Sequence, residues 1–153
     1  MPKLQLRILT TDSVKVDEPV DMVIMRCVYD DMGRRSAVGD IGVMPGHMPM
    51  SAVLGISPFR ILNLEDSTER LIAVYGGVVN VRDNVVTVMT NKAQWPSEID
   101  QAQAEAELQE AERLSGALDD DTSLRNNQIS MRRALVQIEV SSYPLVGGGK
   151  KTN

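Results

Sequence analysis

Cysteine, histidine and aromatic residues are scarce in this sequence. Of 153 residues, one is cysteine and one is histidine, and aromatic residues make up 3%. A single cysteine excludes an internal disulfide framework. Few aromatics argue against binding of single-stranded nucleic acid, which relies on aromatic stacking platforms. The formal net charge of −5 likewise argues against a general polyanion-binding surface.

Long apolar segments are also missing. No run approaches the ~18 residues that a membrane helix requires, and the N-terminus resembles neither a secretory signal nor a presequence. We therefore expect a soluble intracellular protein that partners would hold at any membrane where it works. Hydrophobic residues still reach 42%, enough for a real core. With few aromatics, Val, Ile, Leu and Met must fill that core.

Residues with catalytic or metal-binding chemistry are too few for a recognisable site. The sequence has no Gly-x-Ser-x-Gly elbow and no His-x-x-x-His pair, so we expect no catalytic residues, no metal and no cofactor. His47 is better interpreted as a loop or interface residue. Cys27 alternates with Val23 and Met25, which predicts a buried hydrophobe on a strand. A small β-sandwich enzyme is an alternative interpretation, and the main objection to it is the missing set of catalytic residues.

The first part of the chain has the pattern of short antiparallel strands. Apolar residues alternate with polar ones from Leu4 to Ile8, and residues 59–64 and 71–75 read as strands around a turn at 65–68. Residues 78–82 and 85–89 predict a hairpin, because Asp83-Asn84 tolerates tight-turn geometry. Many short strands without an intervening long helix favour an antiparallel sandwich over a parallel α/β sheet.

The second part of the chain has helical periodicity. Ser97 is a candidate N-cap, and Gly116 ends the first helical pattern. A second helix is expected from Asp121 or Thr122 to about Val140. The predicted buried stripes are Ile99, Ala102, Ala106 and Leu114 on the first helix and Leu124, Met131, Leu135 and Ile138 on the second. A short polar break between the helices predicts an antiparallel hairpin.

These patterns divide the chain into three parts. We predict a β-sandwich domain over residues 1–92, a helical hairpin over 93–142 and a flexible tail over 143–153. The tail follows Pro144 and a run of three glycines, which end regular structure. The fold class is therefore β plus α, with an N-terminal antiparallel sandwich followed by a C-terminal antiparallel two-helix hairpin.

One segment carries the most specific information. Residues 39–49 read Gly-Asp-Ile-Gly-Val-Met-Pro-Gly-His-Met-Pro, and their glycines and prolines predict a shaped surface loop. The segment resembles the signature of the epsilon subunit of the F-type rotary ATP synthase. Residues 4–11, 20–24 and the double-glycine stretch 73–81 are similar to further strands of that family. The resemblance continues in order to about Val140.

This resemblance implies a fold and a function. The family has a ten-strand sandwich that carries a helical hairpin. It implies a non-catalytic central-stalk subunit, which couples rotation of the c-ring to the gamma subunit and restrains ATP hydrolysis through its C-terminal helices. The implied partners are the gamma subunit, the c-ring and the alpha and beta catalytic subunits. The implied location is peripheral, on the cytoplasmic face of a bacterial inner membrane or the stromal face of a thylakoid.

The resemblance also assigns residues to partners. From the sequence alone, Asp40 is an exposed loop carboxylate. Carried over from the family, the c-ring contacts are Asp40, Ile41, Gly42 and Met44, and the gamma contacts are Thr10, Gly46 and His47. The two helical segments differ in charge. The segment 97–121 has nine acids and one base, whereas the second helix is basic. The family uses such basic residues against the beta subunit, which here are Arg125, Arg132 and Arg133.

Two features differ from relatives in the family. A nucleotide-binding motif of some bacterial relatives aligns with residues 99–104, where Asp100 fits but Gln103 replaces an arginine. A neutral amide cannot make the charge-assisted phosphate contact, so we expect weak or absent ATP binding. The alternatives are an ATP-sensing regulator and a structural stalk subunit without inhibition. Residues 30–38 are longer than the usual turn and predict a protruding hairpin.

Overall fold

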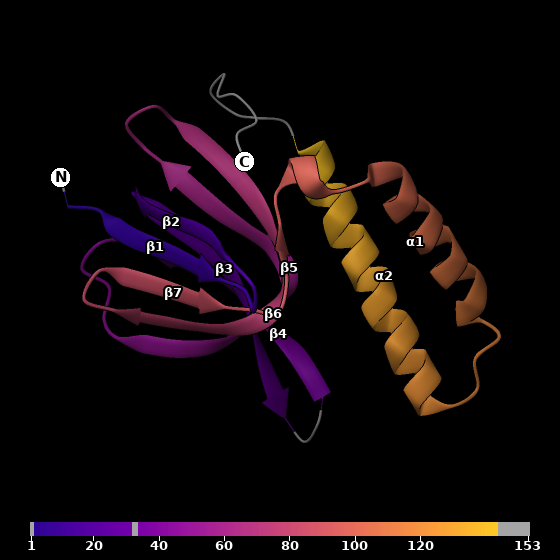
Figure 1. Cartoon of the computed structure of the whole chain (residues 1–153). Coiled ribbons are helices and arrows are strands. Elements are labelled where there is room, and N and C mark those ends of the chain that lie inside the picture. Colours follow the sequence, from indigo (N-terminus) through magenta and orange to yellow (C-terminus); the bar gives the residue numbers. More distant parts are fainter. Residues whose placement is uncertain (1, 32–33, 144–153) are drawn as a thin grey trace.

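The computed structural model describes residues 2–31 and 34–143 and consists of a folded β-sheet with two helices beside it (Figure 1). The strands are β1 (Leu4–Leu9), β2 (Val14–Val20), β3 (Met22–Asp31), β4 (Arg34–Val43), β5 (Met50–Asn63), β6 (Thr68–Arg82), β7 (Val85–Met89) and β8 (Ala93–Gln94). The short 3-10 helix η1 (Pro96–Glu98) and the helices α1 (Gln101–Ser115) and α2 (Asp121–Ser142) follow. This order confirms the predicted fold class.

The strands form one sheet in the order β2-β1-β7-β6-β5-β3-β4, and β8 pairs with β6. Neighbours are antiparallel except β1 and β7, which are parallel. The resemblance implied ten strands, whereas the described residues form eight. The difference arises because β5 and β6 are 14 and 15 residues long and bend from one layer into the other without breaking.

The double glycine, expected to separate two strands, lies inside β6. Gly77 has φ +123°, and a Cβ there would lie 2.3 Å from the carbonyl oxygen of Met89. Only glycine avoids both the strained backbone and this clash. The residue therefore allows the strand to bend while β7 passes close by.

The space between the layers is filled by aliphatic side chains. Leu6, Ile8, Phe59, Ile61 and Val88 are almost fully buried in one continuous cluster. Cys27 lies in the same cluster, as its alternation predicted, and burial raises the pKa of its thiol. Because closely packed interiors deform little, this part of the molecule is stiff.

Two predicted hairpins are confirmed. Asp83 and Asn84 both have positive φ and join β6 to β7, which is the geometry of a two-residue hairpin that matches the strand twist. The pairing of β3 with β4 continues to Asp31 and Arg34, so the insertion before the signature segment extends both strands. Figure 1 shows this hairpin projecting beyond the sheet.

The predicted surface loop over residues 39–49 is partly wrong. Residues 39–43 are the last residues of β4, and only residues 44–49 form a loop. The register changes next to Gly39, since Cys27 pairs with Gly39 and Val28 with Ala37. The glycines of this part therefore belong to a bulged edge strand, which tolerates them because bulges bend and twist an edge.

Residues 20–24, which the family resemblance predicted as one strand, are interrupted at Asp21. β2 ends before it and β3 begins after it. Its carboxylate accepts a hydrogen bond of 2.7 Å from the backbone N–H of Leu64 and pairs with Lys3 at 3.3 Å. The Leu64 hydrogen bond, together with Lys3, lowers the pKa of this carboxyl group. Asp21 therefore fixes a tight connection between two strands.

The first helix begins later than predicted. Asp100, not Ser97, caps α1, and its carboxylate accepts from the N–H of Gln103 at 3.1 Å. Residues 96–98 form η1 instead, in which the Glu98 carboxylate accepts from the N–H of Trp95 at 3.1 Å. Glu98 thus accepts from the N–H at the start of η1, and Asp100 accepts from an N–H in the first turn of α1. The position of Asp100 decides where α1 starts.

The predicted buried stripes of the helices are also wrong in part. On α1 the buried residues are Ala104 and Ala111, while Ala102 and Ala106 are exposed. On α2 they are Ala134, Val136 and Val140, while Leu135 is 48% exposed. α2 contacts both α1 and the strands β5 and β6, so it is covered on two sides and a single-stripe pattern misplaces its core. Among the described residues, no helix is long and apolar enough to cross a membrane.

Candidate functional site

The loop after β4, residues 44–49, is held in one shape. Gly46 has φ +85°, which favours glycine, and the N–H of His47 donates to the carbonyl of Met44 at 3.1 Å. The N–H of Gly46 donates to Oδ1 of Asn84 at 2.7 Å. The loop is thereby tied to the β6–β7 turn, and Met44 and Met48 remain exposed beside it.

His47 is oriented by its own neighbour. Its Nδ1–H donates to the carbonyl of Met48 at 2.7 Å, and a carbonyl can only accept. Within the part of the chain that the structure describes, no group of three His, Cys, Asp or Glu side chains could hold a metal ion. The hydrogen bond to Met48 fixes the ring as part of the loop surface, and a contact of His47 with a partner stays a prediction.

Three of the four residues assigned to the c-ring lie on β4, and Met44 lies in the loop. Asp40 is exposed and pairs with Arg26 of β3, with Nε 3.1 Å from Oδ1. Ile41 is half-buried against the sandwich core, and Gly42 is exposed. The acid therefore already has a basic partner within its own chain, on the outermost strand pair of the sheet.

The residues assigned to gamma lie at two separate places. At the start of β1, the N–H of Gln5 donates to the carbonyl of Asn84, next to the loop that carries Gly46 and His47. Thr10 follows the other end of β1, where its hydroxyl donates to Asp12 at 2.9 Å. Six strand residues at about 3.3 Å each separate the two places. A partner that contacts both must extend along β1.

The outer face of the sheet carries a line of apolar side chains that sequence reasoning missed. Directly paired residues of six neighbouring strands form it: Val53 pairs with Val28 and Val78, Met89 with Val78 and Leu9, and Leu9 with Val14. Val14, Val53, Val78 and Met89 are 44–59% exposed. We call these residues the apolar row: Val28, Val53, Val78, Met89, Leu9 and Val14.

The adjacent line on the same face has the opposite character. Two positions further along four of these strands, and three positions along β2 because of a register shift, the paired residues are all polar. They form the polar row: Ser51, Asn80, Thr87, Arg7 and Asp17. A contiguous exposed apolar patch with a polar border marks an interaction site more often than a random surface does. The hairpin turn at 83–84 fixes the pairing of Val78 with Met89, so sequence alone could have located the centre of the row.

The helices rest on a different part of this outer face. Four buried residues, Leu71, Ala73, Val136 and Val140, form a cluster separate from the sandwich core. The half-buried residues packed against it are Ile56, Tyr75, Ile99 and Tyr143. We call these eight residues the hairpin seat. Figure 1 shows α2 lying between the sheet and α1, so that α2 alone meets the strands.

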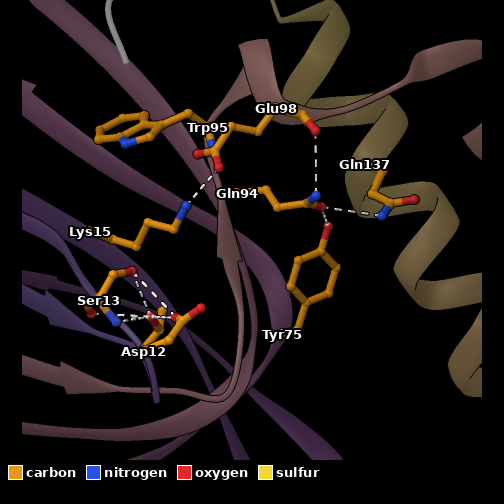
Figure 2. A network of polar contacts seen from close by, with 9 residues as sticks. Asp12, Ser13, Lys15, Tyr75, Gln94, Trp95, Glu98 and Gln137 are labelled. Carbon is orange, nitrogen blue, oxygen red and sulfur yellow. Dashed lines mark hydrogen bonds and ion pairs between the residues drawn. The ribbon is translucent and has the colours of Figure 1, made fainter.

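Polar contacts connect the seat to the segment between the two parts, as Figure 2 shows. The hydroxyl of Tyr75 donates to Oε1 of Gln94 at 2.5 Å. The same oxygen accepts from Nε2 of Gln137 on α2 at 3.4 Å, and Nε2 of Gln94 donates to the carbonyl of Glu98 at 3.4 Å. Gln94 therefore contacts a strand, η1 and a helix at once.

Two titratable groups in this region have shifted pKa values. Burial is the main reason that the pKa of the Tyr75 hydroxyl is raised. Burial would also raise the pKa of Glu98, but the hydrogen bonds from Lys15 and from the N–H of Trp95 outweigh it and lower the pKa. The Nζ of Lys15 lies 2.6 Å from the Glu98 carboxylate, which joins β2 to η1.

The three arginines assigned to inhibition are all exposed but differ in their surroundings. The guanidinium of Arg133 lies over the ring of Tyr75, 5.3 Å from its centroid. Among the described residues, no ion pair or ring contact involves Arg125 or Arg132. The nucleotide candidate Asp100 is the helix cap described above, and Nε2 of Gln103 donates to Glu107 at 3.0 Å.

Comparison with known proteins identifies the family. A family model described as the beta-sandwich domain of the ATP synthase delta/epsilon chain matches residues 3–96. An ATP synthase epsilon chain of Halalkalibacterium halodurans is 32% identical over 142 residues, which cover 92% of this chain and 98% of that one. An ATP synthase epsilon chain of Pediococcus pentosaceus is 34% identical over 143 residues, covering 92% and 96%.

A solved structure has the same fold. A chain in the Euglena gracilis mitochondrial ATP synthase structure matches with a TM-score of 0.71 at 22% identity, covering 90% of this chain and 79% of that chain. The family model spans more than half of the sequence, and the curated relatives match over nearly their full lengths. The chain therefore belongs to the delta/epsilon family of ATP synthase subunits.

Proposed function

We propose that this chain is a non-catalytic subunit of the central stalk of a rotary ATP synthase. In this function the sandwich joins the c-ring to the gamma subunit and transmits torque between them, and the hairpin restrains ATP hydrolysis. The protein is peripheral to the membrane and is held there by its partners. The observation that carries the proposal is the apolar row, a partner-sized surface on a stiff sandwich.

The apolar row is the surface proposed to meet gamma. It crosses six strands, which lie about 4.8 Å apart in a sheet, so it is long enough for an extended or helical partner element. Thr10 directly follows Leu9, a member of the row, and therefore lies beside it. Burying this row would remove apolar side chains from water, which is the main favourable term in most protein associations.

The c-ring contact is proposed to form at β4 and the following loop. Asp40 is exposed at the sheet edge, and its pairing with Arg26 holds the carboxylate in place. A basic group of the c-ring would pair with the Asp40 carboxylate in addition to Arg26. Exposed charged contacts of this kind add specificity and speed of association more than affinity, so Met44 and Ile41 supply the apolar part of the contact.

The restraint of hydrolysis is proposed to come from the hairpin. Its attachment to the sandwich buries four residues fully, a small area compared with the sandwich core. No residue of α1 belongs to this cluster, and the buried residues of α1 are two alanines. Most of the stability of protein helices comes from packing of one face, so the hairpin is held down by a limited set of contacts that can be exchanged for contacts along gamma and the beta subunit.

Capture of gamma by the tagged full chain tests the docking surface. Val78→Glu places a charge in the centre of the apolar row, and Asn80→Glu places the same charge on the same strand and face, in the polar row. We expect Val78→Glu to weaken capture of gamma about tenfold or more, because a charge would be buried without a partner. Asn80→Glu should bind nearly as wild type. Equal losses in both variants would contradict docking through the row.

Deletion of residues 101–153 tests the restraint. The deletion keeps Glu98 and its contact with Lys15, so the sandwich and η1 remain intact. The reconstituted catalytic complex with the shortened chain should hydrolyse ATP several-fold faster than the complex with the full chain. Unchanged hydrolysis, with normal incorporation of the shortened chain, would favour the alternative of a purely structural stalk subunit.

An ATP-sensing function is the second alternative, and the local contacts disfavour it. Asp100 caps α1, and Gln103 is occupied with Glu107. Neither residue supplies positive charge for a triphosphate. Calorimetry of the full chain with Mg-ATP should therefore show no binding in the micromolar range, and micromolar affinity would overturn this expectation.

A further inference from the structure

The three arginines of α2 are not equivalent in this conformation. Successive residues of a helix are about 100° apart, so Arg133 points to the same side as Val136 and Val140, which are buried in the hairpin seat. Arg132 precedes Val136 by four residues and so lies on a neighbouring part of the same side, but it is exposed and, among the described residues, has no ring contact. The Arg133 guanidinium therefore lies where α2 approaches the sheet, over the ring of Tyr75.

Tyr75 is the residue at which the attachments of the seat converge. Its ring packs in the seat and faces two cations, with Lys92 and Arg133 each 5.3 Å from the ring centroid. Its hydroxyl donates to Gln94, which also accepts from Gln137 of α2. Figure 2 shows Tyr75, Gln94 and Gln137 pointing toward one another from β6, β8 and α2. Removal of this one side chain would cut apolar, hydrogen-bonding and cation–π contacts together.

We propose that Tyr75 and Gln94 form a latch that keeps the hairpin on the sandwich and withholds Arg133 from partner subunits while it is there. While it lies over the Tyr75 ring, the Arg133 guanidinium is fixed beside the sandwich, so it can follow the hairpin to a carboxylate of another subunit only after this contact breaks. Arg133 thus acts in both positions of the hairpin, whereas Arg125 and Arg132 are accessible in both. The action of Arg133 after release rests on the proposed function, whereas the latch itself does not.

Amide hydrogen exchange of the isolated full chain tests the latch. The variants are Tyr75→Leu, Arg133→Gln and the matched control Arg132→Gln, which removes the neighbouring charge that has no such contact. We expect Arg133→Gln to speed exchange of amides 134–142 about two- to fivefold, the range for an exposed cation–π contact. Tyr75→Leu should speed it about tenfold or more, because it removes several contacts. Arg132→Gln should change nothing.

Internal references keep this result interpretable. Amides of β1 and β7 report the sandwich, and their rates should be the same in all variants. If Tyr75→Leu perturbs them, Tyr75→Phe keeps the ring and removes only the hydroxyl, and should speed exchange of α2 less than the leucine variant. In the variant that combines Tyr75→Leu with Arg133→Gln, exchange should not be faster than in Tyr75→Leu alone. Equal effects of Arg132→Gln and Arg133→Gln, or full additivity in the combined variant, would overturn the latch.

Hydrolysis by the reconstituted complex separates the latch from the restraint. Tyr75→Leu releases the hairpin with all three arginines intact, so hydrolysis should fall several-fold. Arg133→Gln also loosens the hairpin but removes a side chain that the partner would engage, so hydrolysis should rise. Changes in the same direction would contradict the double use of Arg133. If hydrolysis is unchanged in both variants while their exchange differs as expected, the latch stands and the proposed restraint fails.

Discussion

The sandwich core and the hairpin seat lie on opposite faces of the same strands, yet they differ in how they are closed. In the core, both layers of one sheet contribute side chains, and Leu6, Ile61 and Val86 are completely shielded from water. In the seat, one sheet face meets one helix, and half of its eight members remain partly exposed. A closed interior gives stiffness, and a one-sided contact can be made and broken.

Polar contacts reinforce the same contrast. Glu18 of edge strand β2 pairs with Arg70 of β6, whose guanidinium also lies over the ring of Trp95, 5.5 Å from its centroid. The seat has a longer hydrogen bond from Gln137 and one from the Tyr143 hydroxyl to Glu69 at 3.0 Å. The Gln137 hydrogen bond, at 3.4 Å, is longer than an ordinary N–H···O bond, which suits a hairpin that changes position.

The largest effect is expected where the bent strand of the sandwich cannot accept a side chain. Gly77→Ala combines a backbone at φ +123° with a Cβ contact of 2.3 Å to Met89, so the free energy of unfolding should fall by about 3 kcal/mol or more. Urea denaturation measures this change. Gly116→Ala, where φ is −84° and no atom lies within 4 Å of the new Cβ, should change it by less than about 0.5 kcal/mol. If Gly77→Ala left the free energy of unfolding nearly unchanged, the result would contradict a rigid bend at this residue.

The next prediction compares the two clusters directly. Leu6→Ala in the core should lower the free energy of global unfolding by about 2–5 kcal/mol. Val136→Ala in the seat should cost about 1–2 kcal/mol and should appear only as faster amide exchange in α2. If Val136→Ala lowers the urea midpoint of the sandwich as much as Leu6→Ala does, the two clusters form one cooperative unit.

A smaller local effect is expected at the start of the hairpin. Asp100→Ala removes the side chain that accepts from the N–H of Gln103 and should destabilise α1 by about 1 kcal/mol. Asp100→Asn keeps a capping oxygen and should be nearly neutral. Exchange of the amides of residues 101–104 provides the measurement. A stronger loss in Asp100→Asn than in Asp100→Ala would show that the carboxylate has another role.

The smallest effect should be a pH dependence of the link between the two parts. The pKa of Glu98 is lowered from its ordinary value of 4.5, so its contribution to stability is fully present above that value. It is lost as the pH falls through the lower pKa of the folded state. The difference in stability between wild type and Glu98→Gln should therefore shrink between pH 6 and pH 3. A difference that grows on acidification would contradict this sign.

Particular residues explain how much of this structure the sequence could predict. Alternation identified the strands and the burial of Cys27, and Asp83-Asn84 identified the β6–β7 hairpin, because both signals are local. The start of α1 was missed because Ser97 fits a cap by residue type, whereas Asp100 accepts from the N–H of Gln103 and residues 96–98 form η1. Leu135 was wrongly predicted to be buried because α2 is covered on two sides. A single helical periodicity of apolar residues indicates only one buried side.

The candidate surfaces were predictable to different degrees. The segment at Asp40 and His47 has a strong local pattern, and the structure places it on an edge strand and a fixed loop. The apolar row joins residues as distant in sequence as Val14 and Val78, and strand register alone aligns them. The contact of Arg133 with Tyr75 depends on where α2 docks, which composition and spacing cannot specify.

The central claim, that a stiff sandwich carries a releasable hairpin, is tested most directly by amide hydrogen exchange of the full chain in increasing, non-denaturing urea. We predict that amides 134–142 exchange through an opening of low free energy that depends weakly on urea, while amides of β1, β6 and β7 exchange only through global unfolding. A single opening free energy with the same urea dependence for α2 and for these strands would contradict the account.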